Sequence, residues 1–172
     1  MKWNLFALYF VIATSFLLLL LTEGDTSEGK IRNYYTPADL HCMAEAIYFE
    51  ARSESSAGKL AVGHVILNRT KSKRFPNSIC GVIHQGEHHA SGVPKLNRCQ
   101  FSYYCDGKPD HPGNAKQWRE SLRVAEYLIH GRDFILDITD GSQFYHAKYI
   151  NQPYWAVRKS KQAEIDQHIF YR

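Results

Sequence analysis

The stretch covering residues 36–54 constrains the fold more than any other, because it joins a helix start to a single apolar stripe. Thr36 is a favourable N-cap residue, Pro37 suits the first helical position, and Asp39 stands three residues after the cap. The apolar residues that follow recur at helical spacing: Leu40, Met43, Ala44, Ile47 and Ala51. The pattern therefore predicts a helix with one buried face.

Two carboxylates, Glu50 and Glu54, project onto or beside this apolar stripe, whereas Glu45 projects to the opposite side. Burying a charged carboxylate is costly, so such a group keeps its proton to higher pH, which suits a general acid working near neutrality. Pairing of Glu50 with Arg52 or another cation at a helix end explains the pattern equally well. Periodicity does not choose between Glu50 and Glu54.

A second helix is predicted from Ser55 or Ser56 to about Thr70. It is apolar nearly all round, which indicates a buried central helix. Gly63 costs this helix about 1 kcal/mol of propensity relative to alanine, and a close helix crossing would explain it. We interpret the cations that follow as complements to the helix dipole rather than as a nucleic-acid patch: Arg69, Lys71, Lys73 and Arg74.

The second half of the chain is predicted to form loops, one further helix and short strands. Residues 76–112 carry many turn residues and only short apolar pieces, and loops of this length are often functional. An amphipathic helix ending at Gly131 is then marked by Trp118, Leu122, Ala125, Leu128 and Ile129. Short strands are predicted at residues 134–138, 143–147 and 165–171. The pattern as a whole predicts a mainly helical α+β domain with a small β element.

The N-terminal segment has the features of an export signal. After Lys2, an apolar run without charge covers residues 5–21, a length between a signal-peptide core and a minimal membrane span. No small-x-small cleavage site follows, so we expect an uncleaved or inefficiently cleaved anchor. The predicted organisation is a signal peptide or signal anchor at residues 1–22, a tether at 23–35 and one folded domain at 36–172. The formal charge of +4 suits anionic polymers, cell-wall glycans as well as nucleic acid.

The four cysteines indicate two disulfides, because an even count in an exported chain is typical of cross-links. Three connectivities are possible. One of them joins the local pair Cys99 and Cys105 and leaves Cys42 with Cys80. A zinc site is disfavoured, since the sequence holds no Cys-x-x-Cys pair.

Six sequence blocks between about Leu40 and the C-terminus stand in the order expected for one known protein family. They cover residues 47–54 (Ile-Tyr-Phe-Glu-Ala-Arg-Ser-Glu), 60–69, 75–83, 99–107, 144–147 and 168–172. Together they resemble the SleB/CwlJ family of cell-wall hydrolases, which is named for spore cortex-lytic enzymes but extends beyond spore formers. The resemblance implies a lysozyme-like catalytic domain at residues 36–172 that acts on the glycan backbone of peptidoglycan.

This resemblance also implies roles for individual residues. Glu50 aligns with the first glutamate of the family's Glu-Ala-Arg-x-Glu block and is the expected catalytic acid. Members of the SleB type act as lytic transglycosylases, which cleave between N-acetylmuramic acid (MurNAc) and N-acetylglucosamine (GlcNAc) with one acid, where an ordinary glycosidase needs two carboxylates. The other block members are expected to bind substrate or support the site: Arg52, Glu54, Gln100, Ser102, Tyr103, Asp106, Tyr145 and His146. A satisfied core histidine is an equal explanation for His146.

Two other functions compete with this one. A metal-dependent N-acetylmuramoyl-L-alanine amidase could use His84, His88 and His89 near Glu87, but no His-Glu-x-x-His motif is present, and solvated loop histidines explain them better. A non-catalytic wall-binding module would bind sacculi without releasing fragments. We expect no metal, no cofactor and no nucleic-acid partner. The prediction is a monomer that meets peptidoglycan in the cell envelope, periplasmic or extracytoplasmic, with a membrane tether at its N-terminus.

Overall fold

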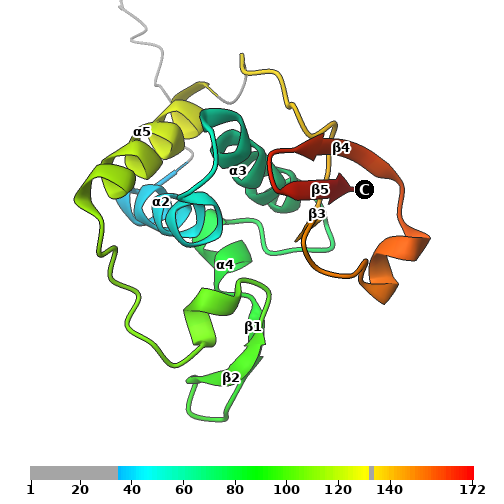
Figure 1. The fold of residues 1–172 in the computed structure, drawn as a ribbon. Coiled ribbons are helices and arrows are strands. Elements are labelled where there is room, and N and C mark those ends of the chain that lie inside the picture. Colours follow the sequence, from blue (N-terminus) through cyan, green and yellow to red (C-terminus); the bar gives the residue numbers. More distant parts are fainter. Residues whose placement is uncertain (1–34, 132–133) are drawn as a thin grey trace, which may run out of the picture. The chain divides into compact units, whose positions relative to one another are not determined.

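The computed structural model describes residues 35–131 and 134–172, in which a group of helices has a three-stranded sheet on one side and a separate two-stranded hairpin. The helices are α2 (Pro37–Ala51), α3 (Ser56–Thr70), α4 (Ile79–Ile83) and α5 (Ala115–Gly131), with two short 3₁₀ helices, η1 (Ser102–Cys105) and η2 (Tyr154–Arg158). The strands are β1 (Gly86–His88), β2 (Pro94–Cys99), β3 (Phe144–Ala147), β4 (Lys161–Ile165) and β5 (His168–Tyr171). Figure 1 shows their arrangement, which confirms the predicted mainly helical α+β class.

Helix α2 begins as predicted and spans the whole apolar stripe, but it does not extend to Glu54. A capping box closes its start, because the Asp39 N–H donates to Thr36 Oγ1 and the Thr36 N–H donates to Asp39 Oδ2, both at 3.1 Å. The helix ends at Ala51, with Arg52 as its C-cap. The helical projection used for Glu54 is therefore wrong, because Glu54 lies in the turn beyond the helix.

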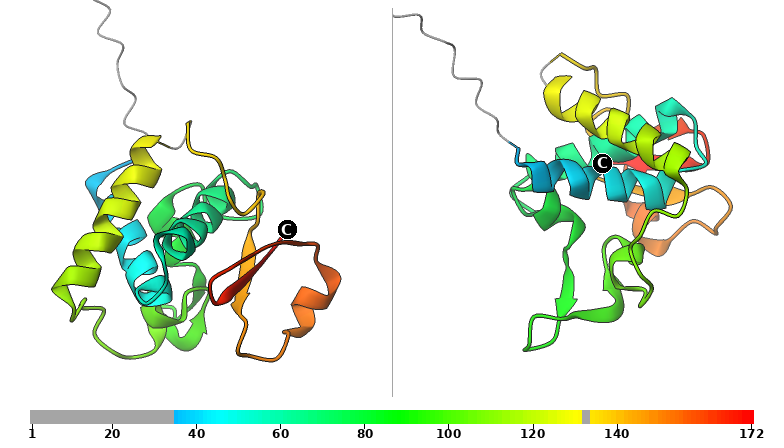
Figure 2. Two further views of the ribbon diagram at one scale, coloured as in Figure 1. Left: turned by 45° about the horizontal axis from the view of Figure 1, so that its top comes forward. Right: turned by 90° about the vertical axis from the view of Figure 1, so that its left-hand side faces the viewer.

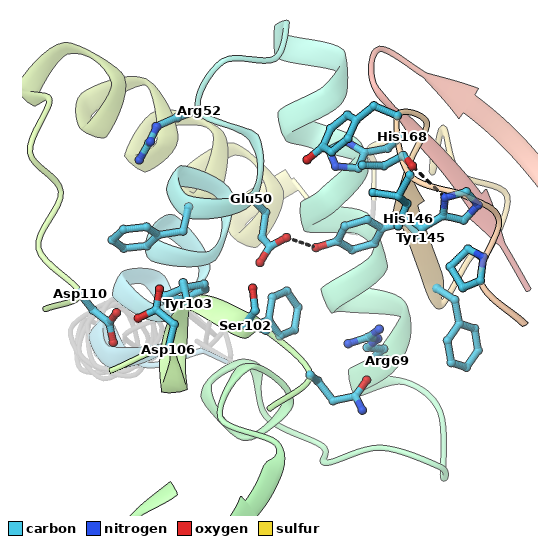
Figure 3. Close-up of a pocket in the computed structure, with 18 of the residues that line it drawn as sticks. Glu50, Arg52, Arg69, Ser102, Tyr103, Asp106, Asp110, Tyr145, His146 and His168 are labelled. Carbon is cyan, nitrogen blue, oxygen red and sulfur yellow. Dashed lines mark hydrogen bonds between the residues drawn. The ribbon is translucent and has the colours of Figure 1, made fainter. Parts of the chain in front are cut away.

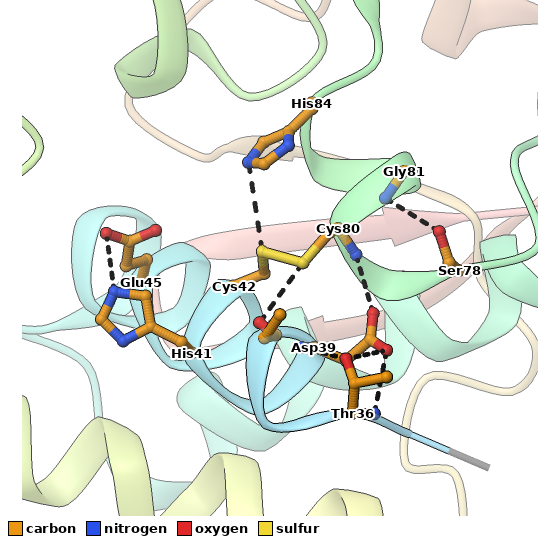
Figure 4. The surroundings of a disulfide bond; sticks show 10 residues. Thr36, Asp39, His41, Cys42, Glu45, Ser78, Cys80, Gly81 and His84 are labelled. Carbon is orange, nitrogen blue, oxygen red and sulfur yellow. Dashed lines mark hydrogen bonds and ion pairs between the residues drawn. A yellow bond between two sulfur atoms is a disulfide. The ribbon is translucent and has the colours of Figure 1, made fainter.

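The start of α2 is tied to α4 by a disulfide between Cys42 and Cys80 (Figure 4). Asp39 supports the same junction, since its Oδ1 accepts the Cys80 N–H at 3.2 Å. On the same helix, Glu45 lies 3.4 Å from the imidazole of His41. The second disulfide joins Cys99 to Cys105, so the structure confirms two cross-links and selects one of the three connectivities.

Helix α3 is the buried central helix that its composition predicted. It packs against α2 and α5 on one side and the small sheet on the other (Figures 1 and 2). Its fully buried apolar residues are Ala61, Val62, Val65, Ile66 and Leu67. A methyl group at Gly63 would overlap Leu128 of α5, which confirms the predicted close crossing. Lys59 adds an ion pair to Glu120 of α5 at 3.0 Å.

The small sheet brings the last residues of the chain beside β3. Its strand order is β3-β5-β4, and both pairings are antiparallel. Tyr145 of β3 stands opposite Phe170 of β5, whose side chain packs on Ala61 and Val65 of α3. The predicted strand at residues 143–147 is confirmed as β3, whereas the predicted single strand at 165–171 is divided by a turn at Asp166, which has a φ of +47°.

The strand predicted at residues 134–138 is wrong, because this segment forms turns. The side chain of Asp137 explains the difference. Its carboxylate accepts the backbone N–H groups of Thr139 and Gly141, both at 2.9 Å, and the Asn68 amide of α3 at 2.7 Å. An aspartate that binds the backbone just after itself favours a turn over an extended strand.

Residues 76–112 contain more regular structure than their turn-rich composition predicted. Ser78 caps the short helix α4 by accepting the Gly81 N–H, and β1 pairs with β2 in an irregular antiparallel hairpin. The chain then enters η1, which the Cys99–Cys105 disulfide holds against the end of β2. This segment forms one side of a groove in the surface of the domain.

No helix within residues 35–131 and 134–172 is long and apolar enough to cross a membrane. The apolar run at residues 5–21 lies outside the described residues. The signal or anchor predicted at 1–22 and nearly all of the tether predicted at 23–35 therefore stay predictions.

Candidate active site

A groove with a cavity volume of about 920 Å³ runs along the side of the domain. Three segments form most of its lining: the end of α2, the segment from Gln100 through η1 to Asp110, and the segment from β3 to η2. Arg69 of α3 and His168 of β5 complete it. Figure 3 shows Glu50 and Tyr145 facing one another across it, with Asp106 and Asp110 to one side and Arg69 to the other. The groove therefore has one acid at its middle, an acidic end and a basic end.

Glu50 lies in the last turn of α2 and is partly buried. The Tyr145 hydroxyl donates a hydrogen bond to Glu50 Oε2 at 3.0 Å. Burial raises the pKa of the Glu50 carboxyl above its ordinary value, against the opposing effects of the Tyr145 hydrogen bond and the positive charge of Arg69. Glu50 therefore keeps its proton to higher pH than a solvated glutamate, as a general acid requires.

Tyr145 is held in place by the sheet. Its ring meets the His168 ring edge-on at a centroid distance of 5.2 Å and lies 5.8 Å from the Phe170 ring. Burial, and then the nearby Glu50 charge, raise the pKa of Tyr145 well above its ordinary value. The phenol therefore stays protonated and acts as a hydrogen-bond donor to Glu50.

The segment around η1 contributes the predicted residues Gln100, Ser102, Tyr103 and Asp106, all of which line the groove. The Tyr103 ring stacks on Phe49 of α2 at a centroid distance of 4.6 Å, which fastens this segment to the helix that carries Glu50. The Lys108 N–H donates to Asp106 at 2.8 Å and lowers the pKa of that carboxyl. Burial and the neighbouring Asp106 raise the pKa of Asp110.

Of the remaining predicted residues, Arg52 lines the groove and Glu54 supports a neighbouring turn. Arg52 lines the groove, with its guanidinium 5.4 Å from the centre of the Tyr48 ring. Glu54 does not line it: its Oε2 accepts the Gln167 N–H at 3.1 Å, in the turn between β4 and β5. Glu54 therefore supports the loop that carries β5 and does not face the cavity.

His146 was predicted either to line the site or to be a satisfied core histidine, and it does both. It is buried, yet it forms part of the groove wall. Its Nδ1 donates to the Ala147 carbonyl at 2.9 Å, so in the neutral ring Nε2 accepts from the Tyr171 hydroxyl at 3.0 Å. With both ring nitrogens engaged, His146 is a satisfied histidine that shapes the wall.

The site residues predicted from the sequence left out several residues that line the groove, among them Arg69, Asp110, Trp155 and His168. Arg69 was interpreted as a dipole-complementing cation, but only 5% of its surface is exposed. Its Nε donates to the Gln143 carbonyl at 2.8 Å, and its guanidinium lies 5.4 Å from the Phe101 ring centre. The signal was available, since Arg69 follows Val62 and Val65 at helical spacing on a buried face.

The histidines considered as metal ligands do not form a metal site. Among the described residues, no group of three or more His, Cys, Asp or Glu side chains is placed to hold a metal ion. His84 stacks on Tyr104 at a centroid distance of 4.2 Å, whereas His88 and His89 are exposed on the β1–β2 hairpin.

Comparison with known proteins identifies the relatives of this chain. Spore cortex-lytic enzymes are similar over a limited stretch: that of Bacillus cereus is 47% identical over 53 residues, covering 31% of this chain and 20% of the relative. That of Bacillus subtilis (strain 168) is 49% identical over 61 residues, covering 36% and 20%. The match thus spans about one fifth of the length of these relatives.

Two solved structures are similar over most of the described fold. The catalytic domain of the Bacillus cereus SleB protein has a TM-score of 0.59 and 28% identity, covering 80% of this chain and 92% of that one. The catalytic domain of the germination-specific lytic transglycosylase SleB from Bacillus anthracis has a TM-score of 0.59 and 30% identity, covering 83% and 100%. These similarities confirm the lysozyme-like fold expected from the sequence. The profile of the cell wall hydrolase family matches residues 53–171, and the chain therefore belongs to this family.

Proposed function

We propose that this protein cleaves the glycan backbone of peptidoglycan between MurNAc and GlcNAc, with Glu50 as its single catalytic acid. The observation that carries the proposal is the Glu50 carboxyl itself, partly buried in the groove, with a raised pKa and one oxygen bound by Tyr145. Membership of the cell wall hydrolase family and similarity to SleB catalytic domains support peptidoglycan as the substrate.

The hydrogen bond from Tyr145 assigns the two oxygens of Glu50 different tasks. Because the phenol donates to Oε2, the proton of the neutral acid belongs on Oε1. Within the described residues, Oε1 has no hydrogen-bond partner of its own. Oε1 gives this proton to the glycosidic oxygen while the bond from that oxygen to C1 of MurNAc breaks. The carboxylate that results is stabilised by the Tyr145 hydroxyl and by the charge of Arg69.

The second step needs no additional carboxylate. The Glu50 carboxylate accepts the proton of the MurNAc 6-hydroxyl as O6 attacks C1, which forms a 1,6-anhydro ring and consumes no water. Glu50 is protonated again at the end of the cycle. A hydrolytic reaction would require a second carboxylate. Asp106 and Asp110 line the groove and are the candidates for it, whereas Glu54 and Asp140 lie outside.

The rest of the groove suits a chain of sugars. Phe49, Tyr103 and Trp155 contribute aromatic side chains, and Gln100 contributes an amide, to the lining of a cavity that is open at the surface. Aromatic rings stack on the apolar faces of pyranoses, and amides bond their hydroxyl and acetamido groups. We assign Gln100, Ser102, Tyr103 and Tyr145 to substrate binding or support of Glu50 on this basis.

The proposal is tested by incubating the purified full-length protein with purified sacculi, with and without a metal chelator, and identifying released fragments by mass spectrometry. Glycan cleavage predicts disaccharide-peptides whose release is insensitive to the chelator. Free stem peptides whose release the chelator abolishes would support an amidase instead. Binding without release would leave a wall-binding module.

We also propose that the protein is exported, with residues 1–22 as signal peptide or retained anchor. The apolar run at residues 5–21 and the two disulfides support an oxidising compartment outside the cytoplasm. N-terminal sequencing of the protein from its host tests the anchor, because a mature protein beginning near Gly24 contradicts it. Recovery in the cytoplasmic fraction would contradict export altogether.

A further inference from the structure

Positive charge gathers around the aromatic ring of Phe144 at the basic end of the groove, where Arg69 lines the groove and Arg74 and Lys159 lie beside it. This ring lines the groove, and three cationic groups lie near its centre: Lys159 Nζ at 3.5 Å, the Arg74 guanidinium at 5.4 Å and the Arg69 guanidinium at 5.9 Å. The three side chains come from the end of α3, the turn after it and the residue that follows η2. Separate segments of the chain thus converge to build this cluster.

Arg69 is the buried member of the cluster and has an unused donor. It is one of the residues that line the groove (Figure 3), and only 5% of its surface is exposed. Its Nε is bound to the Gln143 carbonyl, but among the described residues its buried Nη1 has no hydrogen-bond partner. A buried donor of a charged group without an acceptor is costly, so such a donor indicates an acceptor supplied by a ligand.

No carboxylate of the described residues is in contact with the cluster, although the Glu50 charge acts on Arg69 across the groove. In the part of the chain that the structure describes, none of the three cations makes an ion pair, although Lys59 and Lys148 each pair with a glutamate at 3.0 Å. Burial and the like charge of Arg74 lower the pKa of Lys159. An anion in contact with these groups would remove both the repulsion and the unmet hydrogen bond.

We propose that Arg69, Arg74 and Lys159 form a subsite for a free carboxylate of the peptide stem of peptidoglycan. This rests on the proposed function, because the subsite borders the same groove, which Arg69 lines, and binds the same polymer. In intact strands the lactyl carboxyl of MurNAc is bound in an amide, so the free carboxylates belong to the stem peptides. The subsite therefore gives the enzyme a preference for glycan that carries peptide, and it orients the strand by placing a stem at the basic end.

Binding measured in the Glu50→Gln background tests the subsite without requiring cleavage. Co-sedimentation compares native sacculi with sacculi whose carboxylates have been converted to methylamides. We expect about tenfold weaker binding to the amidated sacculi, the size of one lost hydrogen-bonded charge interaction. Adding Arg74→Gln and Lys159→Gln should weaken binding to native sacculi and abolish the difference between the two polymers.

The matched control carries Lys116→Gln and Arg119→Gln on α5, which remove the same two kinds of charge from exposed positions outside the groove. This control should keep the tenfold preference. Equal binding of the parent protein to both polymers, or an equal loss of preference in the control, would overturn the subsite. A preserved preference in a wild-type protein that releases no glycan fragments would instead overturn the proposed function and leave the subsite standing.

Discussion

Two of the three main walls of the groove meet at one hydrogen bond but arise in different ways. The helical wall is the last turn of α2, which carries Phe49 and Glu50, and short-range features build it: a capping box and an apolar stripe. The strand wall is β3, whose Tyr145 reaches its position only because β3 pairs with β5. Tyr145 is 95 residues from Glu50 in the sequence. Local sequence therefore places the acid, and long-range pairing places the group that tunes it.

This difference predicts a ranking of effects. A change to the acid on the helical wall should stop the chemistry. A change to the donor on the strand wall should alter the rate and the pH dependence while the acid remains. A change to Glu54, beyond the end of the helix, should do least, because that side chain faces the β4–β5 turn.

Glu50→Gln should have the largest effect. The amide keeps the shape of the side chain but cannot donate a proton as an acid, so fragment release from sacculi should fall at least about a hundredfold. The pKa of Glu50 is raised in the folded protein, so its ionisation costs stability once the pH exceeds its ordinary value, and glutamine removes that cost. The melting temperature at neutral pH should therefore be no lower than that of the wild type. Glu45→Gln on the same helix is the control, and an active Glu50→Gln protein would refute the assignment.

Tyr145→Phe should have an intermediate effect. In the wild type, the Tyr145 hydrogen bond stabilises the Glu50 carboxylate formed during the reaction, so its loss should lower the rate about tenfold. The same bond lowers the pKa of Glu50, so without it that pKa rises further. Because activity requires protonated Glu50, the alkaline limb of the pH–rate profile should move to higher pH. A limb that stays in place or moves to lower pH would show that Tyr145 does not tune the acid; exposed Tyr127→Phe on α5 is the control.

Glu54→Gln should have the smallest effect. Its side chain accepts the Gln167 N–H, and the glutamine oxygen can still accept this bond, so activity should stay within about threefold of wild type. Fragment release and thermal unfolding measure the two parts of this expectation. A loss as large as that of Glu50→Gln would mean that the acid had been assigned to the wrong glutamate.

The difference between local sequence features and long-range contacts also explains how much of the fold was predictable from the sequence. Helices α2, α3 and α5 each carry an apolar pattern and end signals within a few turns, and all three were predicted. The hairpin β1–β2 and helix α4 are short and rich in turn residues, so they show no period long enough to detect. The segment at 134–138 has strand-like residues, but the hydrogen bonds of Asp137 turn the backbone.

For the site, periodicity alone supplied two candidate carboxylates and could not rank them. The choice of Glu50, and the prediction that Tyr103, Asp106 and Tyr145 share its groove, came from the family resemblance. The structure brings these residues together and places Glu54 elsewhere. Arg69 was missed because a cation in the last turn of a helix is usually a solvated complement to the dipole. Its helical spacing from Val62 and Val65 indicated a buried position, and the packing of Phe101 and Phe144 around it confirms that position.

Single-acid cleavage by Glu50 is tested most directly by digesting sacculi in water enriched in heavy oxygen and weighing the released fragments. Attack by the MurNAc 6-hydroxyl predicts anhydro ends that are lighter by one water than hydrolysis products and carry no heavy oxygen. Glu50-dependent fragments with reducing ends that have gained one heavy oxygen would contradict this mechanism. That result would make water the nucleophile and require a second carboxylate, for which Asp106 and Asp110 are the groove-lining candidates.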